Sequence, residues 1–511
     1  MEVYAAAKHE IKKPETEFGK ADAAFAFISI ICGFLYWCLN RIFKTGAGTA
    51  VFSVMLFTVT FIYMSRSGVK QNAQSIICLL LATMLTAQIS IFDNGLIASL
   101  SFLLLSAVYI YWICLSAERR IENRISVYIL GDAIKQLFII PFSNFGCCVA
   151  GINGFSKSGK LKKYLYAVVG LLIFMPFIAV VIMLLVLADS AFEEFTNKAF
   201  EYIETYRIFN FIIQILAGIP VAFYLYGLAY GNIKARYTDR LSAESADRVA
   251  QSLRFAPGPA VYAALTSLNL IYIVFFAVQA VYFFSAFSGG LPEQFSYAEY
   301  ARRGFFELCG VAVINLAVLT VSHLFAKREP KTEPKMLRAQ TLTISLFTML
   351  LIATALSKMI MYIDRFGLTQ LRVLTSWFMA LLFFIFLIIS VRQTVRFNAA
   401  KLMVICSVLW FLVLSFCNID GLTAKYNISR YQNGTLEELD ISALGQLSDA
   451  AVPHLYDLYI KTDDGDLRVR IEDALLYREH NIQKDIRQLN YQKHIADKIR
   501  TELRAALGIR N

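Results

Sequence analysis

A glycine-rich segment has the most specific chemical spacing in this sequence. Residues 154–160 read GFSKSGK, with two glycines and a lysine at the spacing of a phosphate-binding loop. The next residue is Leu161, where such a loop needs a Ser or Thr for magnesium, and no hydrophobic strand precedes the segment. We therefore interpret the local lysines as a basic anchor beside a membrane helix, namely Lys157, Lys160, Lys162 and Lys163.

The other residue types that carry catalysis form no recognisable motif. Five histidines are scattered along the chain without an HExxH motif or an i,i+4 pair, and the sequence has no CxxC or GxSxG motif. The adjacent acids Glu193–Glu194 and Glu437–Glu438 have the pattern of solvated surface charge. We expect no catalytic residues, no metal site and no cofactor, and we favour a protein that is not an enzyme.

The composition indicates a membrane protein with many spans. Of 511 residues, 57% are apolar and only 17% are charged. The apolar residues gather in runs of roughly 17–25 residues, a length that crosses a bilayer as a helix. We predict an all-α fold, a polytopic transmembrane helix bundle of about eleven spans. The predicted spans are residues 23–40, 48–64, 74–92, 96–115, 164–188, 208–230, 260–286, 304–325, 340–362, 371–391 and 399–418.

Lys and Arg residues are concentrated in alternate loops. Loops on the side of the N-terminus are rich in them, whereas the opposite loops hold few. The positive-inside rule then predicts a cytoplasmic N-terminus, and an odd number of spans places the tail outside the cytoplasm. One span more or fewer would reverse the side of the tail. We expect a multi-pass protein of the cell membrane, with the lipid bilayer as partner and protein partners left open. Because the net charge of +11 belongs to these loops, we expect no nucleic-acid binding.

The sequence divides into three parts. We expect a cytoplasmic N-terminal segment at residues 1–22, a transmembrane domain at 23–418 and a soluble helical tail at 419–511. The cytoplasmic loop 117–163 is either an amphipathic surface helix followed by a loop or a partly re-entrant segment. In the tail, apolar residues at helical spacing predict several helices, the last followed by Gly508. These helices would form a small extracytoplasmic C-terminal domain.

Three stretches carry a resemblance to a known family. Residues 297–323 read YAEYARRGFFELCGVAVINLAVLTVSH, a charged and aromatic collar that leads into a span. The others are GLTQLR at 367–372 and NIDGLTAKYNISRY at 418–431, which runs on into LDISALGQLSDAAVP. Together they resemble the bacterial polytopic membrane proteins of domain-of-unknown-function family 4173, with its 4153-type relatives. The resemblance covers residues 297–453, implies a membrane architecture and assigns no chemistry.

The predicted topology brings these three stretches to the outer face. Glu307 and Asn315 indicate that their helix faces protein rather than lipid. Pairing of Lys358 or Arg372 with Glu307 or Asp364 is the alternative to simple snorkelling. We predict an outer cluster that docks the tail or binds a ligand, formed by Tyr297, Glu299, Arg302, Arg303, Glu307, Lys358, Asp364, Arg365, Thr369, Arg372, Asn418, Asp420, Arg430 and Tyr431.

Several functions are compatible with this cluster. It is either a structural clamp for the tail or a site for an envelope component, a lipid headgroup or a signal. We favour an envelope-associated sensory or regulatory scaffold with an outward-facing polar site. The first alternative is a transporter or lipid flippase, which predicts an internal repeat and a deep central cavity. The third possibility is an envelope-modifying enzyme, which requires a further polar catalytic cluster.

Overall fold

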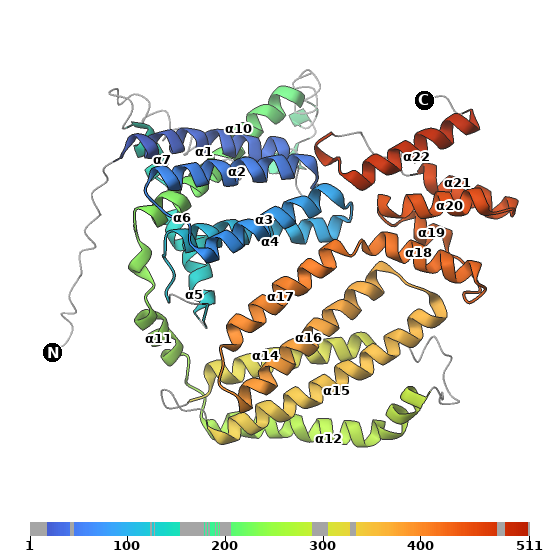
Figure 1. Cartoon of the computed structure of the whole chain (residues 1–511). Coiled ribbons are helices and arrows are strands. Elements are labelled where there is room, and N and C mark those ends of the chain that lie inside the picture. Colours follow the sequence, from blue (N-terminus) through green and yellow to red (C-terminus); the bar gives the residue numbers. More distant parts are fainter. Residues whose placement is uncertain are drawn as a thin grey trace.

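The structure is a computed structural model of the whole chain (Figure 1). It describes residues 18–40, 45–122, 125–126, 128–153, 206–288, 305–327, 334–477 and 486–508, with isolated residues between 178 and 194. Ten of the described helices are long and apolar enough to cross a membrane. They match ten of the predicted spans, and the remaining span, 164–188, lies almost entirely outside the described residues. The prediction of a polytopic helical membrane protein is therefore confirmed.

The N-terminal helices form a first bundle (Figure 1). It consists of α1 (Lys20–Leu39), α2 (Ala47–Arg66), α3 (Ala73–Ile91), α4 (Gly95–Ser116) and α10 (Tyr206–Ile233). The side chains of Asn72 and Asn94 begin α3 and α4, because each accepts a hydrogen bond from an amide in the first helical turn. The helices pack in chain order, α1 on α2, α2 on α3 and α3 on α4, with α10 along α1.

Small residues set the close approach of α1 and α10. Gly33 and Gly218 face each other, and a Cβ on Gly218 would lie 2.8 Å from the backbone of Gly33. Such contacts between small residues let transmembrane helices pack backbone to backbone. Beside this crossing, the ring of Phe25 stacks on Tyr63 at 4.1 Å and on Tyr226 at 5.9 Å between centroids. The first bundle thus has a tightly packed aromatic core.

The later helices form a second bundle. It consists of α12 (Gly258–Ser288), α14 (Phe305–Phe325), α15 (Lys335–Phe366), α16 (Gln370–Thr394) and α17 (Ala399–Phe416). The fully buried Asn315 on α14 accepts from the Tyr272 hydroxyl of α12 and donates to Thr348 of α15 at 2.8 Å. The prediction that α14 faces protein is confirmed at Asn315, whereas Glu307 in its first turn is exposed. These bonds join three helices at a buried level, where an unpaired amide would be costly.

Short helices follow α4 and cover one end of the first bundle. They are α5 (Ile129–Ile134), the π-helical turn η1 (Lys135–Ile139), α6 (Ile140–Ser143) and α7 (Cys147–Asn153). Gly227 and Gly231 of α10 leave room for α6, whose Pro141 and following Asn144 lie against them. Residues 129–153 of the predicted loop 117–163 are therefore mostly helical and packed on protein, while residues 154–163 lie outside the described residues. The connection to the second bundle contains η2 (Thr238–Arg240) and α11 (Ala243–Ser252).

The tail is helical and has its own apolar core. Its elements are α18 (Ile419–Gln432), α19 (Ile441–Gly445), η3 (Asp449–Ala451), α20 (Val452–Lys461), α21 (Gly465–Tyr477), η5 (Ile486–Gln488) and α22 (Tyr491–Leu507). Leu455, Ile471 and Leu503 are buried between these helices. Gly508 ends the last helix at φ +68°, a left-handed conformation that glycine adopts without strain. This helix end is where the sequence predicts it.

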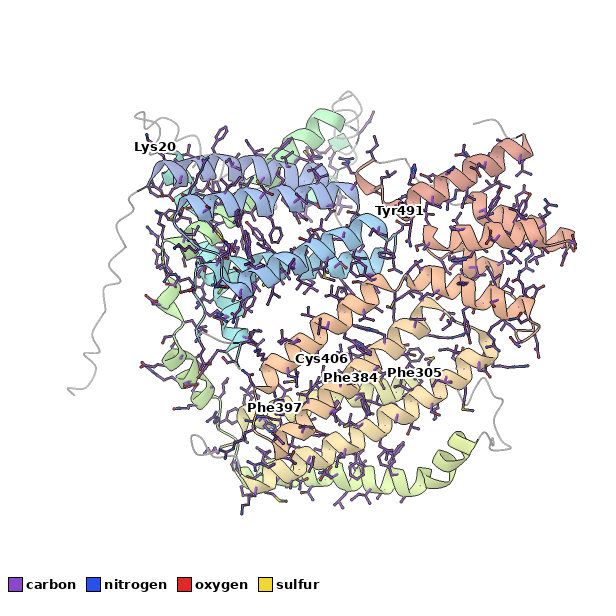
Figure 2. The ribbon with its side chains drawn as sticks, viewed as in Figure 1. Lys20, Phe305, Phe384, Phe397, Cys406 and Tyr491 are labelled. Atoms are coloured by element: carbon purple, nitrogen blue, oxygen red, sulfur yellow. The ribbon has the colours of Figure 1, made fainter. Side chains whose placement is uncertain are left out.

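The tail and the short helices lie at opposite ends of the long helices. In Figure 1 α18–α22 gather at the right, whereas α5–α7 and α11 lie at the left. We call these ends the tail face and the loop face. The start of α1 at Lys20 is on the loop face (Figure 2), and the end of α17 runs into the tail. At the tail face the tail contacts turns from both bundles, which makes it the place to look for a functional junction.

Candidate functional site

Arg430 of α18 binds the tail to the second bundle. Its guanidinium donates to the Asp364 carbonyl at 2.7 Å and lies 3.3 Å from the Asp364 carboxylate, at the end of α15. The same side chain donates to the Thr435 carbonyl at 2.8 Å, which holds the chain that follows α18. Next to it, Arg365 forms a two-pronged pair with Glu437 at 3.0 and 3.2 Å. The Arg430 side chain is 16% exposed and that of Arg365 53%, so Arg430 is the stronger anchor.

The turn between α15 and α16 is also held by a side chain of the tail. Asn427 of α18 accepts from the Leu368 amide at 2.7 Å and donates to the Leu368 carbonyl at 2.8 Å. Gly367 precedes this contact at φ +74°, and a Cβ there would meet the Asn427 side chain. Arg372 donates to the carbonyls of Phe366 and Gly367 and lies 4.1 Å over the Tyr362 ring. The turn therefore has a fixed shape into which the tail amide fits.

The start of the tail contacts the first bundle. Asn94, in the turn between α3 and α4, donates to the Asp420 carboxylate at 3.0 Å, and the Ser448 amide donates to the same oxygen at 3.2 Å. Asn418 precedes α18 in a left-handed conformation, φ 46°, and its side chain accepts from Gln492 of α22 at 2.9 Å. Both Asn94 and Asp420 are buried. One end of the tail is thus fastened to the α3–α4 turn.

A buried carboxylate pair completes this contact. The Asp93 carboxylate accepts from the Asn490 side chain at 2.9 Å and from the Asp449 amide at 3.3 Å. Burial, and then the charge of Asp449, raise the pKa of Asp93, while Asn490 and Lys493 act in the opposite direction. Asp449 is paired with Arg500 of α22 at 2.6 Å, and both side chains are almost fully buried. The contact between the tail and the first bundle therefore depends on protonation as well as packing.

The α1–α2 turn supplies a third contact. Arg487 of η5 donates to the Cys38 carbonyl at 2.9 Å, and the Ala47 amide donates to the Leu489 carbonyl at 2.9 Å. Gly46 lies against the backbone of Gln488, with no room for a Cβ. The tail thereby touches three turns, two from the first bundle and one from the second. We call this set of contacts the tail junction.

The structure brings together about half of the predicted outer cluster. Eight members lie at the tail junction or directly beside it, namely Asp364, Arg365, Thr369, Arg372, Asn418, Asp420, Arg430 and Tyr431. Of these, Thr369 caps α16 and Tyr431 packs against the tail core. Glu307 acts electrostatically on Lys358, between α14 and α15. Four predicted members, Tyr297, Glu299, Arg302 and Arg303, lie outside the described residues.

Sequence reasoning missed the partners that the first bundle and the tail contribute. Asp93 and Asn94 stand in the short FDNG turn between two spans, which is a capping pattern and gives no hint of a distant partner. Arg500 follows Ala496 and precedes Leu503 on one side of α22, all three buried. An arginine on an otherwise apolar helix face was the available signal, because a buried arginine requires an acidic partner.

A second polar cluster lies on the loop face. The side-chain amides of Gln136 and Asn232 pair with each other at 3.0 and 2.8 Å. Lys135 donates to the Arg119 carbonyl at 2.7 Å and lies 3.5 Å from Asp132. In the sequence, Asp132, Lys135 and Gln136 appear as polar residues in a segment at the membrane interface, and the structure places all three in the protein interior. The π-helical turn, which begins at Lys135, is a distortion frequent at functional sites.

The opposite side of this segment is apolar and exposed. Leu130, Ile134, Phe138 and Phe142 recur at intervals of four residues and are 53–74% exposed. A segment with its polar side against protein and its apolar side outward is suited to lipid rather than water. Among the described residues, no group of three or more His, Cys, Asp or Glu side chains is placed to hold a metal ion.

Comparison with known proteins gives one match. A family model described as Domain of unknown function (DUF4153) matches residues 75–458, from α3 into α20 of the tail. The match is to the 4153-type relatives, and the expected assignment to family 4173 is not confirmed. It also begins far upstream of residue 297, where the sequence resemblance began. No curated protein and no solved structure matches the chain.

Proposed function

This chain belongs to the DUF4153 family, and we propose that it is an envelope-associated regulatory scaffold whose tail holds two membrane bundles together. The observation that carries the proposal is that one tail binds turns of both bundles, through Arg430 and Asn427 on one side and Asp420 and Asn490 on the other. These contacts are polar, and the Arg365–Glu437 pair at their edge is exposed, so they are suited to being released and remade. A permanent support would be better served by an apolar interface.

The side of the membrane follows from charge. The loop face carries the basic loops, so the positive-inside rule places it in the cytoplasm and the tail in the envelope. An envelope component or lipid headgroup would meet the tail junction first at Arg365 and Glu437, the exposed pair at its edge, and would loosen the tail by also displacing Arg430 from Asp364. The expected response is a change in the spacing of the bundles, which would report the ligand to the cytoplasmic loops.

The test is a distance measurement between the bundles. Spin labels at Ser65→Cys on α2 and Arg392→Cys on α16 occupy exposed positions on the loop face, one in each bundle. In a background without native cysteines, we expect one narrow distance distribution, and a broad one when Asn427→Ala and Asp420→Asn are added. Arg470→Ala, an exposed change on α21, is the matched control. An unchanged distribution in a variant whose tail is accessible to protease would refute the scaffold.

Lipid transport is the second candidate function. The observation that favours it is an apolar crevice between the bundles, with a volume of about 530 Å³, lined by α3, α4, η1 and α17. Transport predicts that purified protein accelerates the exchange of labelled lipid between the leaflets of vesicles. A scaffold predicts no acceleration.

A further inference from the structure

The crevice between the bundles runs from the loop face toward the middle of the membrane. Its deep part is lined by Met84 of α3, Leu104 of α4 and Leu412 of α17. Its shallow end is lined by Tyr111, at the end of α4, and by Asp132 of α5. In Figure 2 the helix that carries Cys406, α17, lies across from the first bundle. A volume of about 530 Å³ is within the range of sites that bind small molecules.

The α17 wall combines an apolar stripe with a cation at its shallow end. Ile405 and Leu409 line the crevice and are 39% and 56% exposed. Lys401 precedes Ile405 by one helical turn, which places both on the same side of α17, and it is exposed. The position of this helix end is fixed, because the Asn398 side chain donates to the carbonyl of Ile125, another lining residue, and caps the Lys401 amide at 3.0 Å.

A second cation, Arg120, lies near the same end, beside two residues of the opposite wall. The charge of Arg120 acts on Tyr111 and on Asp132, both of which line the crevice. Arg120 also interacts with the Tyr111 side chain, while the Nε and Nη1 atoms of its guanidinium are buried. Asp132 is already paired with Lys135. Lys401, Arg120 and Lys135 are cations and Asp132 is an anion, so these four side chains give the shallow end a net positive charge.

We propose that the crevice binds an anionic phospholipid of the loop-face leaflet, with an acyl chain along α17 and the phosphate between Lys401 and Arg120. An apolar groove selects for a hydrocarbon chain, and two cations at the membrane interface select for a negative headgroup. Phosphate oxygens supply the acceptors that a guanidinium requires. No residue of the site belongs to the tail junction, so the proposal does not rest on the scaffold function.

Native mass spectrometry of the full-length protein in detergent tests the site. The probes are phosphatidylglycerol and phosphatidylcholine with identical acyl chains, added in a titration. We expect one phosphatidylglycerol to bind more tightly than phosphatidylcholine. Lys401→Gln or Arg120→Gln should weaken the binding of phosphatidylglycerol roughly tenfold or more, because hydrogen bonds to charged groups are stronger than those between neutral groups. Lys401→Arg, which keeps the charge, should restore the preference and guards against a folding defect.

Crevice and control variants separate the parts of the proposal. Val408→Trp, which fills the groove from α17, should weaken both lipids. Arg66→Gln, which removes an exposed cation from the end of α2, should change neither. Equal binding of the two lipids by the unmodified protein would overturn the proposal, and so would unaltered phosphatidylglycerol binding in Val408→Trp. Displacement of phosphatidylglycerol by inorganic phosphate alone would show a headgroup site without the acyl groove and would equally overturn it.

Discussion

The side-chain amide of Asn94 lies 3.0 Å from the carboxylate of Asp420, across 326 residues of sequence. Asn94 performs two tasks with one side chain, because its oxygen also accepts from the Ile97 amide at 3.0 Å and so begins α4. The cap of a membrane helix and the attachment of the tail are therefore the same residue. Any change at Asn94 affects both the end of α4 and the position of the tail.

Arg430→Ala should loosen the tail, and Arg365→Ala should do so far less. Arg430 is mostly buried and holds Asp364 and Thr435 through hydrogen bonds from a charged group, which contribute about 1.5–3 kcal/mol. The exposed pair of Arg365 and Glu437 contributes about 0–1 kcal/mol. Limited proteolysis of the tail in membranes measures the difference. Equal protection of the two variants would contradict the ranking.

Arg500→Met should destabilise the tail itself. Breaking a buried ion pair costs about 3–5 kcal/mol, because the Asp449 carboxylate remains buried without its partner. Lys498→Met, an exposed change on the same helix, is the control. The measurement is thermal unfolding of the purified variants, monitored by the protease sensitivity of α20–α22. A loss of stability no larger than that of Lys498→Met would show that Arg500 is dispensable for the stability of the tail.

The docking of the tail should depend on pH through Asp93. Its pKa is raised at the tail junction by burial and by Asp449, so the docked state takes up a proton more readily than the detached state. The stabilisation of docking by this proton is complete at pH values below the ordinary Asp pKa of 3.8, and it is lost as the pH rises through the raised pKa of Asp93. Asp93→Asn, which is neutral at every pH, should dock more firmly than the native chain at neutral pH and remove this part of the dependence.

Comparing the native chain with Asp93→Asn separates the titration of Asp93 from that of other groups in the tail. Burial lowers the pKa of His454 in α20, so protonation of His454 weakens the tail as the pH falls, in both proteins alike. The measurement is labelling of a cysteine in η5, such as Gln488→Cys, over a range of pH. Parallel curves for the native chain and Asp93→Asn would exclude Asp93 as the titrating group.

Gly218→Ala and Gly310→Ala should have opposite effects on stability. A Cβ at Gly218 would lie 2.8 Å from the backbone of α1, which forces α1 and α10 apart and costs about 1–3 kcal/mol. A Cβ at Gly310 of α14 meets nothing within 4 Å, and removing a glycine from a helix gains about 0.5–1 kcal/mol. The unfolding midpoints of the two variants in detergent measure these effects. A shift in the same direction for both variants would contradict the packing argument.

The membrane spans were predictable from the sequence because hydropathy is a local property. The tail junction was less predictable, because the residues that pair in it are distant in the sequence. Every described long helix lies where an apolar run of sufficient length predicts it. Arg430 and Asp364 were expected at one level because both follow span ends, and the structure pairs them. Asp93 and Arg487 carry no such signal, since their partners at Asn490 and Cys38 depend on how the tail folds back. Lys135 and Gln136 have the sequence pattern of a surface segment. In the structure Lys135 contacts Asp132 and the Arg119 carbonyl, and Gln136 pairs with Asn232 of α10, so their burial depends on distant partners.

The left-handed Asn418 is the joint between α17 and the tail, and it makes the tail a lever. Only Cys417 and Asn418 separate the last membrane helix from α18, which leaves no slack in the connection. The same helix α17 carries Ile405 and Leu409, which form one wall of the crevice. The tail and one wall of the crevice at the opposite face are thereby connected through a single helix.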